Sequence, residues 1–167
     1  SLPQFDGSVT HVVWSKNGSR IAFAGTEQTA ESNDASIFGF DASGKGNSSV
    51  FVYDAATGER VTSPMGGSNL VKALDITSDG GTVCFAANRY PTIYRIDERT
   101  TSGQPSRSTS TVLMARFIGD SSFAALVHED GAIEFNHSRA AYANDEAAHL
   151  AKWSPVDNRL ATACYDR

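Results

Sequence analysis

The chain has 167 residues, of which 40% are hydrophobic, and it carries a formal net charge of −5 with a sequence pI of about 5.3. A chain of this size and apolar content can bury a core and would ordinarily form one domain. The acidic balance argues against nonspecific nucleic-acid binding, which needs a basic face. The sequence shows neither an apolar stretch long enough for a transmembrane helix nor the basic start and apolar run of a signal peptide.

The first part of the chain predicts a group of β-strands. Apolar residues at 11–14 precede a polar turn, and a second apolar run follows at 21–25. A third run lies at 50–54, and residues 60–63 predict a short outer strand. Short apolar runs between turn signals are typical of buried strands. The insertion at 26–49 is polar except around residues 37–40, which predict either a short hairpin packed on its own sheet or an apolar element that docks a partner.

The same pattern returns three more times. The second copy predicts strands at 73–76, 83–87 and 92–97, with a weak or missing outer strand in the Ser/Thr-rich segment that follows. The third predicts strands at 113–117, 123–127 and 132–136, and then a degenerate outer strand near 138–148 for which a helical turn is the alternative. The fourth predicts only two strands, at 150–153 and 160–164.

The spacing within the copies is nearly constant. The first strand ends in a large residue, and the second begins 7, 7, 6 and 7 residues later in the four copies. The four pairs are Trp14 and Ile21, Ile76 and Val83, Phe117 and Phe123, and Trp153 and Leu160. Repeats of about 40 residues with several strands each are typical of β-propeller blades. Trp14 and Trp153 are therefore expected to be core anchors between blades.

Several segments resemble the WD40-repeat β-propellers. Trp153-Ser-Pro, Leu160-Ala-Thr-Ala and Tyr165-Asp-Arg are similar to that family's strand a, strand b and b–c turn. Val52-Tyr53-Asp54 followed by Thr57-Gly58 is similar to its strand c and c–d turn, with Tyr in place of the usual Trp. No Gly-His pair opens a copy, so the family's buried His–Ser/Thr–Trp–Asp network is not expected. The looser TolB-like and YncE-like propellers, which carry similar "VYDAATGE" strands, are the second family considered.

The resemblance implies an all-β fold of propeller blades, each a four-stranded antiparallel sheet, with about three and a half blades present. The expected blades are 9–64, 71–108, 111–143 and an incomplete 147–167, with the insertion 26–49 in the first. Blades pack face to face, so an open arc would leave apolar faces at both ends, which proteins rarely keep bare. We therefore expect the remaining blades to come from the rest of a longer chain or from another chain.

Cys84 and Cys164 fall in the second strands of copies that are not neighbours, so we expect no disulfide between them. Small thiols in buried strands usually act as compact apolar residues. Reduced cysteines indicate a cytoplasmic or nuclear protein.

The resemblance also implies a function, which is a non-enzymatic scaffold that binds protein partners within a larger assembly. The family commonly binds peptides on the face that carries the b–c and d–a loops. The two alternatives are a propeller accessory domain of an enzyme, as in TolB-like peptidases, and an RNA-associated propeller. The predicted partner-binding residues are Phe38, Phe40, Arg89, Tyr90, His128, Asp130, Tyr165 and Arg167.

No catalytic, cofactor or metal site is predicted. The sequence has neither a Gly-x-Ser-x-Gly elbow nor a phosphate-binding P-loop. The cluster His128-Glu129-Asp130, with His137 nearby, lacks a recognised metal-ligand spacing, and adjacent strand residues point to opposite faces. A turn-forming role is the alternative for Asp130 and Asp166.

Overall fold

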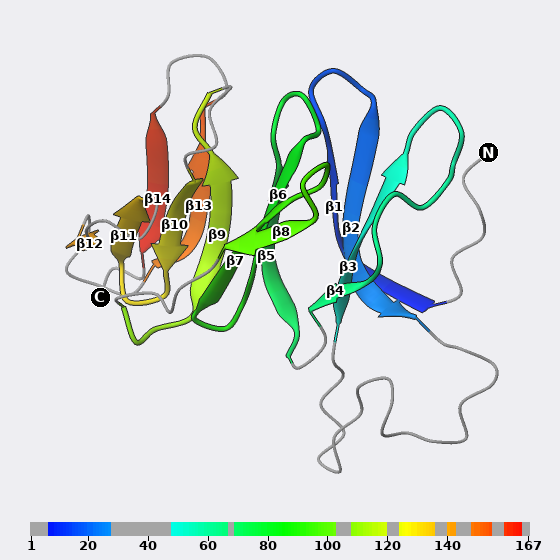
Figure 1. Ribbon diagram of the computed structural model, residues 1–167. Coiled ribbons are helices and arrows are strands. Elements are labelled where there is room, and N and C mark those ends of the chain that lie inside the picture. Colours follow the sequence, from blue (N-terminus) through cyan, green and yellow to red (C-terminus); the bar gives the residue numbers. More distant parts are fainter. Residues whose placement is uncertain are drawn as a thin grey trace, which may run out of the picture.

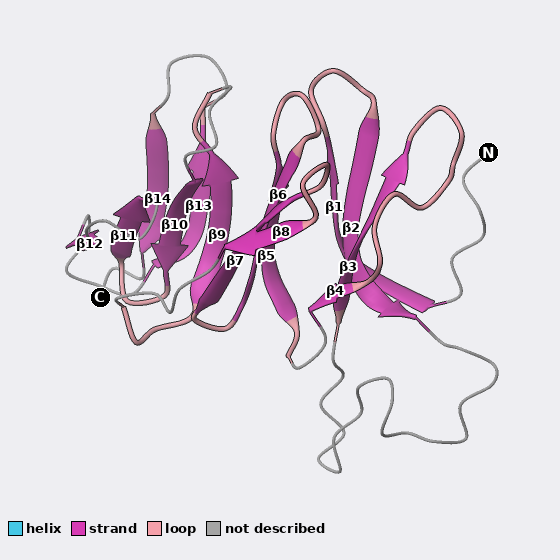
Figure 2. Ribbon diagram, viewed as in Figure 1, coloured by secondary structure: helices cyan, strands magenta, loops and turns pink. Residues whose placement is uncertain are grey.

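A computed structural model describes residues 7–27, 48–66, 69–102, 108–119, 124–135, 140–142, 148–154 and 159–164. Within these ranges all regular structure is β, and the strands form antiparallel sheets that follow one another along the chain (Figures 1 and 2). The predicted all-β class, a partial propeller of antiparallel blades, is confirmed.

Four sheets account for all the strands of the described chain. The first sheet contains β1 (Gly7–Trp14), β2 (Arg20–Glu27), β3 (Ser49–Asp54) and β4 (Met65–Gly66). The second contains β5 (Val71–Ile76), β6 (Thr82–Ala87), β7 (Tyr90–Arg95) and β8 (Thr100–Ser102). The third contains β9 (Val112–Phe117), β10 (Ala124–His128), β11 (Ala132–Phe135) and β12 (Ala140–Tyr142), and the fourth pairs β13 (Ala148–Trp153) with β14 (Leu160–Cys164). The first strand of each sheet contacts the first strand of the next.

Strand register shows that the four copies are structurally equivalent. The residue that ends the first strand always pairs with the residue seven positions later. The pairs are Trp14 with Ile21, Ile76 with Val83, Phe117 with Ala124, and Trp153 with Leu160. In the third copy the spacing of six that the sequence indicated is therefore seven in the strand register, because Phe117 pairs with Ala124. Phe123, which the sequence predicted as the first large residue of that strand, lies outside the described residues.

Each first strand also carries a bulge at the same place. The register skips one residue near the start of β1, β5, β9 and β13. The bulged residues are Thr10, Lys72, Leu113 and His149. A bulge leaves one residue unpaired and bends the strand, so each first strand departs from a regular ladder at this position.

One outer strand differs from the sequence-based expectation, and another agrees with it. Residues 60–63 contribute only an isolated bridge between Arg60 and Tyr53, and the fourth strand of the first sheet is β4. Pro64 lies between these two segments and has no amide hydrogen to donate, which accounts for the break. In the third sheet, β12 shows that the outer segment forms a strand and not the alternative helical turn.

The turns between first and second strands are built alike in the first two sheets. The hydroxyl of Ser15 accepts a hydrogen bond from the Arg20 amide at 2.9 Å, and the hydroxyl of Thr77 accepts one from the Thr82 amide at 2.9 Å. Each hydroxyl also donates to the side chain two residues later, at 2.8 Å and 2.6 Å. Glycine follows at φ of 71° and 78°, a left-handed conformation that glycine adopts without strain.

The two turns are also bonded to each other. The backbone amide of Asn17 donates to the carbonyl of Ser78 at 3.0 Å. The guanidinium of Arg20 donates to the carbonyl of Gly80 at 2.9 Å and pairs with Asp97 at 3.1 Å. These contacts fasten the first sheet to the second at the end of the molecule that we call the a–b end.

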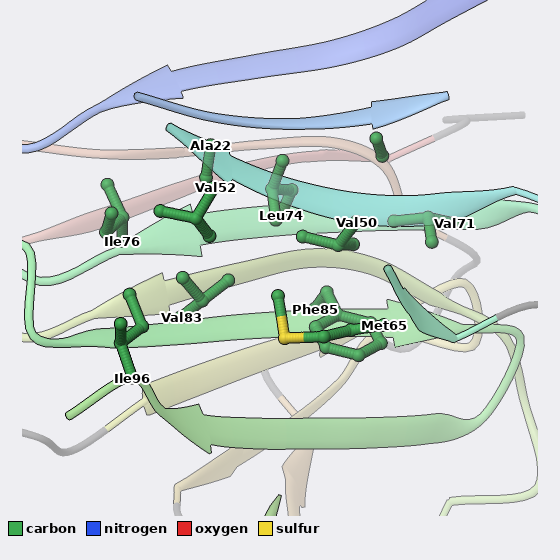
Figure 3. Close-up of a cluster of buried hydrophobic side chains, with 11 residues drawn as sticks. Ala22, Val50, Val52, Met65, Val71, Leu74, Ile76, Val83, Phe85 and Ile96 are labelled. Carbon is green, nitrogen blue, oxygen red and sulfur yellow. The ribbon is translucent and has the colours of Figure 1, made fainter. Parts of the chain in front are cut away.

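The core lies between the sheets. Small and medium side chains of the first sheet, among them Ala22, Val50 and Val52, face larger ones of the second. Figure 3 shows this cluster, in which Leu74, Ile76, Val83 and Phe85 are the main contribution of the second sheet. The opposite face of the second sheet packs on the third through a cluster that includes Ala73, Cys84, Ala86, Phe117 and Leu126. The second sheet is therefore buried on both faces, as its continuous apolar strands predict.

One buried carboxylate joins the second and third sheets. Asp75 accepts hydrogen bonds from the Arg116 guanidinium at 2.7 Å and from the Phe117 amide at 2.8 Å. Burial raises the pKa of the Asp75 carboxyl, and the Arg116 charge and the Phe117 amide oppose this effect. Both donors sit on β9, so the carboxylate ties the first strands of neighbouring sheets together.

The outer face of the first sheet is only partly covered. Phe23 stacks on Phe51 and Tyr53 with ring centroids 5.3 Å and 5.4 Å apart. On β1, however, Val9, Val12 and Trp14 are 46%, 52% and 57% exposed. Cross-strand pairing places these three on the same face as Phe23. The prediction that Trp14 is a buried core anchor is thus wrong for this structure, whereas the side chain of Trp153 lies outside the described part and its prediction stands untested.

Removing the turn hydroxyl of Thr77 should destabilise the protein. Thr77→Ala leaves the partly buried Thr82 amide without its side-chain acceptor, so we expect the free energy of unfolding to fall by about 1–3 kcal/mol. Urea denaturation measures this change. The matched control is Ser78→Ala in the same turn, expected within about 0.5 kcal/mol of the parent protein. Equal losses in the two variants would contradict the assigned role of Thr77.

The thiol of Cys84 should be almost inert in the folded protein. It is free and fully buried, and burial, with the Asp75 charge as a second cause, raises its pKa from 9.0 to about 12. Because the thiolate is the nucleophile, we expect iodoacetamide at pH 8 to alkylate Cys84 at least about a hundredfold more slowly in native protein than in urea. Mass spectrometry of the peptide that contains Cys84 follows the reaction, and comparable rates in both states would refute this environment.

Candidate interaction surface

The end of the sheets opposite the a–b turns carries the turns between second and third strands, and we call it the b–c end. Here the first residue of each first strand donates its amide to the preceding sheet. Val71 donates to Ser48 Oγ at 2.7 Å, Val112 to the Asn88 carbonyl at 2.9 Å, and Ala148 to the Glu129 carbonyl at 2.9 Å. The donors are all buried. Hydrogen bonds between neighbouring sheets therefore fix the backbone that carries the exposed residues of these turns.

Arg89 and Tyr90 form an exposed pair at the b–c turn of the second sheet. Ala87 pairs with Tyr90 across a two-residue turn, and Asn88 has a φ of 57°, which asparagine tolerates better than most residues. The Arg89 Cζ atom lies 5.4 Å from the centroid of the Tyr90 ring, and its Nη2 donates to the Tyr90 hydroxyl at 3.3 Å. Tyr90 remains 48% exposed. The predicted residues Arg89 and Tyr90 are thus brought together in a defined geometry.

Two further residues lie at the same end of the second sheet. Val71, which pairs with Ala87 beside Tyr90, is flanked by Leu70 and the bulged Lys72. Leu70 is 42% exposed, and Lys72 is exposed as well. We call Leu70, Lys72, Arg89 and Tyr90 the rim patch. The sequence signal for Lys72 was its place one residue after the start of a first strand, but the bulge that turns it outward could not be seen.

His128 and Asp130 have a different environment from Arg89 and Tyr90. His128 is fully buried at the end of β10, where its Nδ1 lies 3.3 Å from the Ser110 carbonyl. Its Nε2 lies 3.9 Å from Glu134 Oε2, and Glu134, also fully buried, accepts a hydrogen bond from the Ser108 amide at 2.8 Å through Oε1. Asp130 accepts hydrogen bonds from the Ser108 hydroxyl at 2.8 Å and the Ala132 amide at 3.1 Å.

These contacts form a polar network within the third sheet and the segment that enters it. Asp130 holds its own turn, as the turn-forming alternative predicted, and the network anchors residues 108–110. Partner binding by His128 and Asp130 stays a prediction, and the His128 side chain offers no exposed surface for it. Sequence reasoning missed Glu134 and Ser108, although an acidic residue amid an apolar strand was a visible signal.

The remaining predicted residues, Phe38, Phe40, Tyr165 and Arg167, lie outside the described residues. In the described ranges, no group of three or more His, Cys, Asp or Glu side chains could hold a metal ion. The same ranges contain no helix long and apolar enough to cross a lipid bilayer.

Comparison with known proteins identifies the fold through structure alone. No family model matches the sequence, and no curated protein matches it significantly. The C-terminal WD40 domain of Sif2 superposes with a TM-score of 0.65 at 11% identity, over 95% of this chain. The chain has the fold of a WD40 β-propeller. The structures of U3-55K and of the RRP9 WD40 repeats each give a TM-score of 0.61 at 15% identity, over 88% of this chain.

The WD40-type chain spans about two fifths of the solved propellers that it matches, with coverage of 41%, 43% and 42% of their lengths. The predicted resemblance to WD40 propellers is confirmed at the level of the fold. The third blade contains the buried His128–Glu134 network described above.

The different burial of His128 and Arg89 gives a test in this WD40-type fold. His128→Ala removes a fully buried side chain, so we expect a loss of about 2–3 kcal/mol in the free energy of unfolding. Arg89→Ala should change it by less than about 0.5 kcal/mol, because the Arg89 side chain is exposed and its contact with Tyr90 lies at the surface. Urea denaturation compares the two variants, and a tolerated His128→Ala would show that the network does not stabilise the blade.

Proposed function

We propose that this chain is part of a non-enzymatic WD40-type scaffold that binds protein partners at its b–c end. The observation that supports this most directly is the Arg89–Tyr90 pair, which is exposed yet held in place by its own cation–π contact and hydrogen bond. Arginine and tyrosine are favoured anchors of protein interfaces. A pair that is ordered before binding loses less conformational freedom when a partner docks.

The buried polar groups support a structural rather than a catalytic role. Asp75 bridges two sheets, and Asp130 and Glu134 accept hydrogen bonds from the chain segments that they hold. His128 is enclosed within its blade, where no substrate could reach it. We also propose an intracellular location, cytoplasmic or nuclear, with which the free thiol of Cys84 agrees.

We further propose that the exposed face of β1 is covered by another blade, from the rest of a longer chain or from another chain. The support is physical. The second sheet packs large apolar residues against the first sheet and buries them there. On the outer face of the first sheet, which corresponds to that face of the second, Val9, Val12 and Trp14 are instead about half exposed. An exposed apolar sheet face of this kind is suited to packing against a neighbouring blade in a larger assembly.

This second proposal predicts self-association of the isolated 167-residue chain. Without a covering blade, the face with Val12 and Trp14 should drive aggregation, and the double variant Val12→Lys/Trp14→Lys should reduce it. Sedimentation velocity across a concentration series measures the effect, with Lys16→Glu on the adjacent turn as the control. A monodisperse parent monomer with a sharp thermal transition would defeat the proposal.

The scaffold function predicts that partner binding depends on the b–c end. We expect the double variant Arg89→Ala/Tyr90→Ala, in the whole protein expressed in its own cells, to lose at least one stably bound protein by about tenfold. Quantitative mass spectrometry after native purification and cross-linking measures this loss. Lys16→Ala/Arg95→Ala, with both changes at the a–b end, is the control. An unchanged set of bound proteins in the first variant would count against the proposed function.

A further inference from the structure

We infer that the rim patch binds an acidic peptide segment that carries a large apolar side chain next to an aspartate or glutamate. This inference rests on the proposed function and adds the chemistry of the partner. Its basis is the placement of two cations and two exposed apolar side chains at one end of the second sheet.

The charges of the rim patch are unmatched. Neither Lys72 nor Arg89 pairs with an acidic side chain in the described structure, although the chain as a whole has a net charge of −5. Three other arginines do pair with acids, Arg20 with Asp97 at 3.1 Å, Arg95 with Glu98 at 3.7 Å, and Arg116 with Asp75 at 2.7 Å. Among the described residues, the polar contact of the Arg89 guanidinium is with Tyr90, and the side chain is exposed, so its remaining donors can bind a carboxylate.

The apolar part of the rim patch determines what else the peptide must carry. Leu70 is 42% and Tyr90 48% exposed, and both lie at the b–c end of the second sheet, where Ala87 of β6 pairs with Val71 on one side and with Tyr90 on the other. A purely anionic ligand would leave these two side chains in water. A peptide with one large apolar residue would cover them and gain burial energy in addition to the ionic contacts.

Nucleic acid fits this surface less well than a peptide does. Phosphate-backbone binding needs several cations along a path, and the protein's net negative charge would repel a polyanion. Two cations at one end of a sheet, together with two exposed apolar side chains, instead match one or two carboxylates and an apolar neighbour. The orientation of Arg89, set by its contact with Tyr90, favours a bidentate contact with a carboxylate.

Selection of displayed random peptides on the whole wild-type protein, with elution by free wild-type protein, tests the inference. We expect enriched peptides to contain Asp or Glu beside a large apolar residue. Fluorescence anisotropy with a synthetic copy of the enriched sequence should then give a Kd about tenfold weaker for Arg89→Glu and for Lys72→Glu. Arg95→Glu, a charge reversal at the a–b end, is the matched control and should leave the Kd unchanged. Affinity should also fall as salt rises.

The outcomes separate this inference from the proposed function. Peptides that lose affinity for Tyr90→Ala but lack acidic residues would overturn the inference and leave the scaffold function standing. Peptides that bind wild type and Arg89→Glu equally, and that Tyr90→Ala does not weaken, would overturn both. Displacement of the peptide by a single-stranded RNA oligonucleotide at similar concentration would also overturn the inference, because it would show a general anion site.

Discussion

The first three sheets of this chain carry apolar side chains on both faces, and this constraint determines the rest of the structure. The second sheet presents Leu74, Val83 and Phe85 on one side and Cys84 and Ala86 on the other. Such a sheet is stable only between two neighbours, and each neighbour then needs a further one. An array of this kind ends without exposed apolar surface only if it closes into a ring. On the outer face of the first sheet, Val12 and Trp14 of β1 are about half exposed, as this constraint leads one to expect for a sheet packed on one side.

Hydrophobic burial has no preferred direction, so it does not by itself fix the position of one sheet against the next. Hydrogen bonds at three places between neighbouring sheets fix this position. Asn17 and Arg20 bond to the next turn at the a–b end, and the amide of Val71 bonds to Ser48 at the b–c end. Between the ends of the next interface, Asp75 receives the Arg116 guanidinium and the Phe117 amide. Burying a carboxylate is unfavourable, as the raised pKa of Asp75 indicates, but two short hydrogen bonds to one neighbouring strand offset part of that cost and set the register between sheets.

The repeat and its strands could be predicted from sequence because they depend on local alternation and turn chemistry. The turn around Gly18 and the strands on either side of it follow from such signals. The outer strands could be predicted only in part, since they are short and held by few pairs, as the two-residue β4 shows. The site was predicted in part. Arg89 and Tyr90 follow from the turn position alone, whereas the burial of His128 depends on Glu134 and Ser108, which are distant in sequence from one another.

The b–c turns explain how one frame can carry different surfaces. In the second sheet, the Asn88 carbonyl accepts the Val112 amide, so this residue belongs to the interface between sheets, and the next two residues are free to face solvent. In the third sheet, the Glu129 carbonyl accepts the Ala148 amide in the same way, but Asp130 turns back to hold Ser108. The packing uses the backbone of the turn, which any residue can supply. Side chains at the turn can therefore change from blade to blade without disturbing the stack, and the Arg89–Tyr90 pair is what this freedom has produced in the second blade.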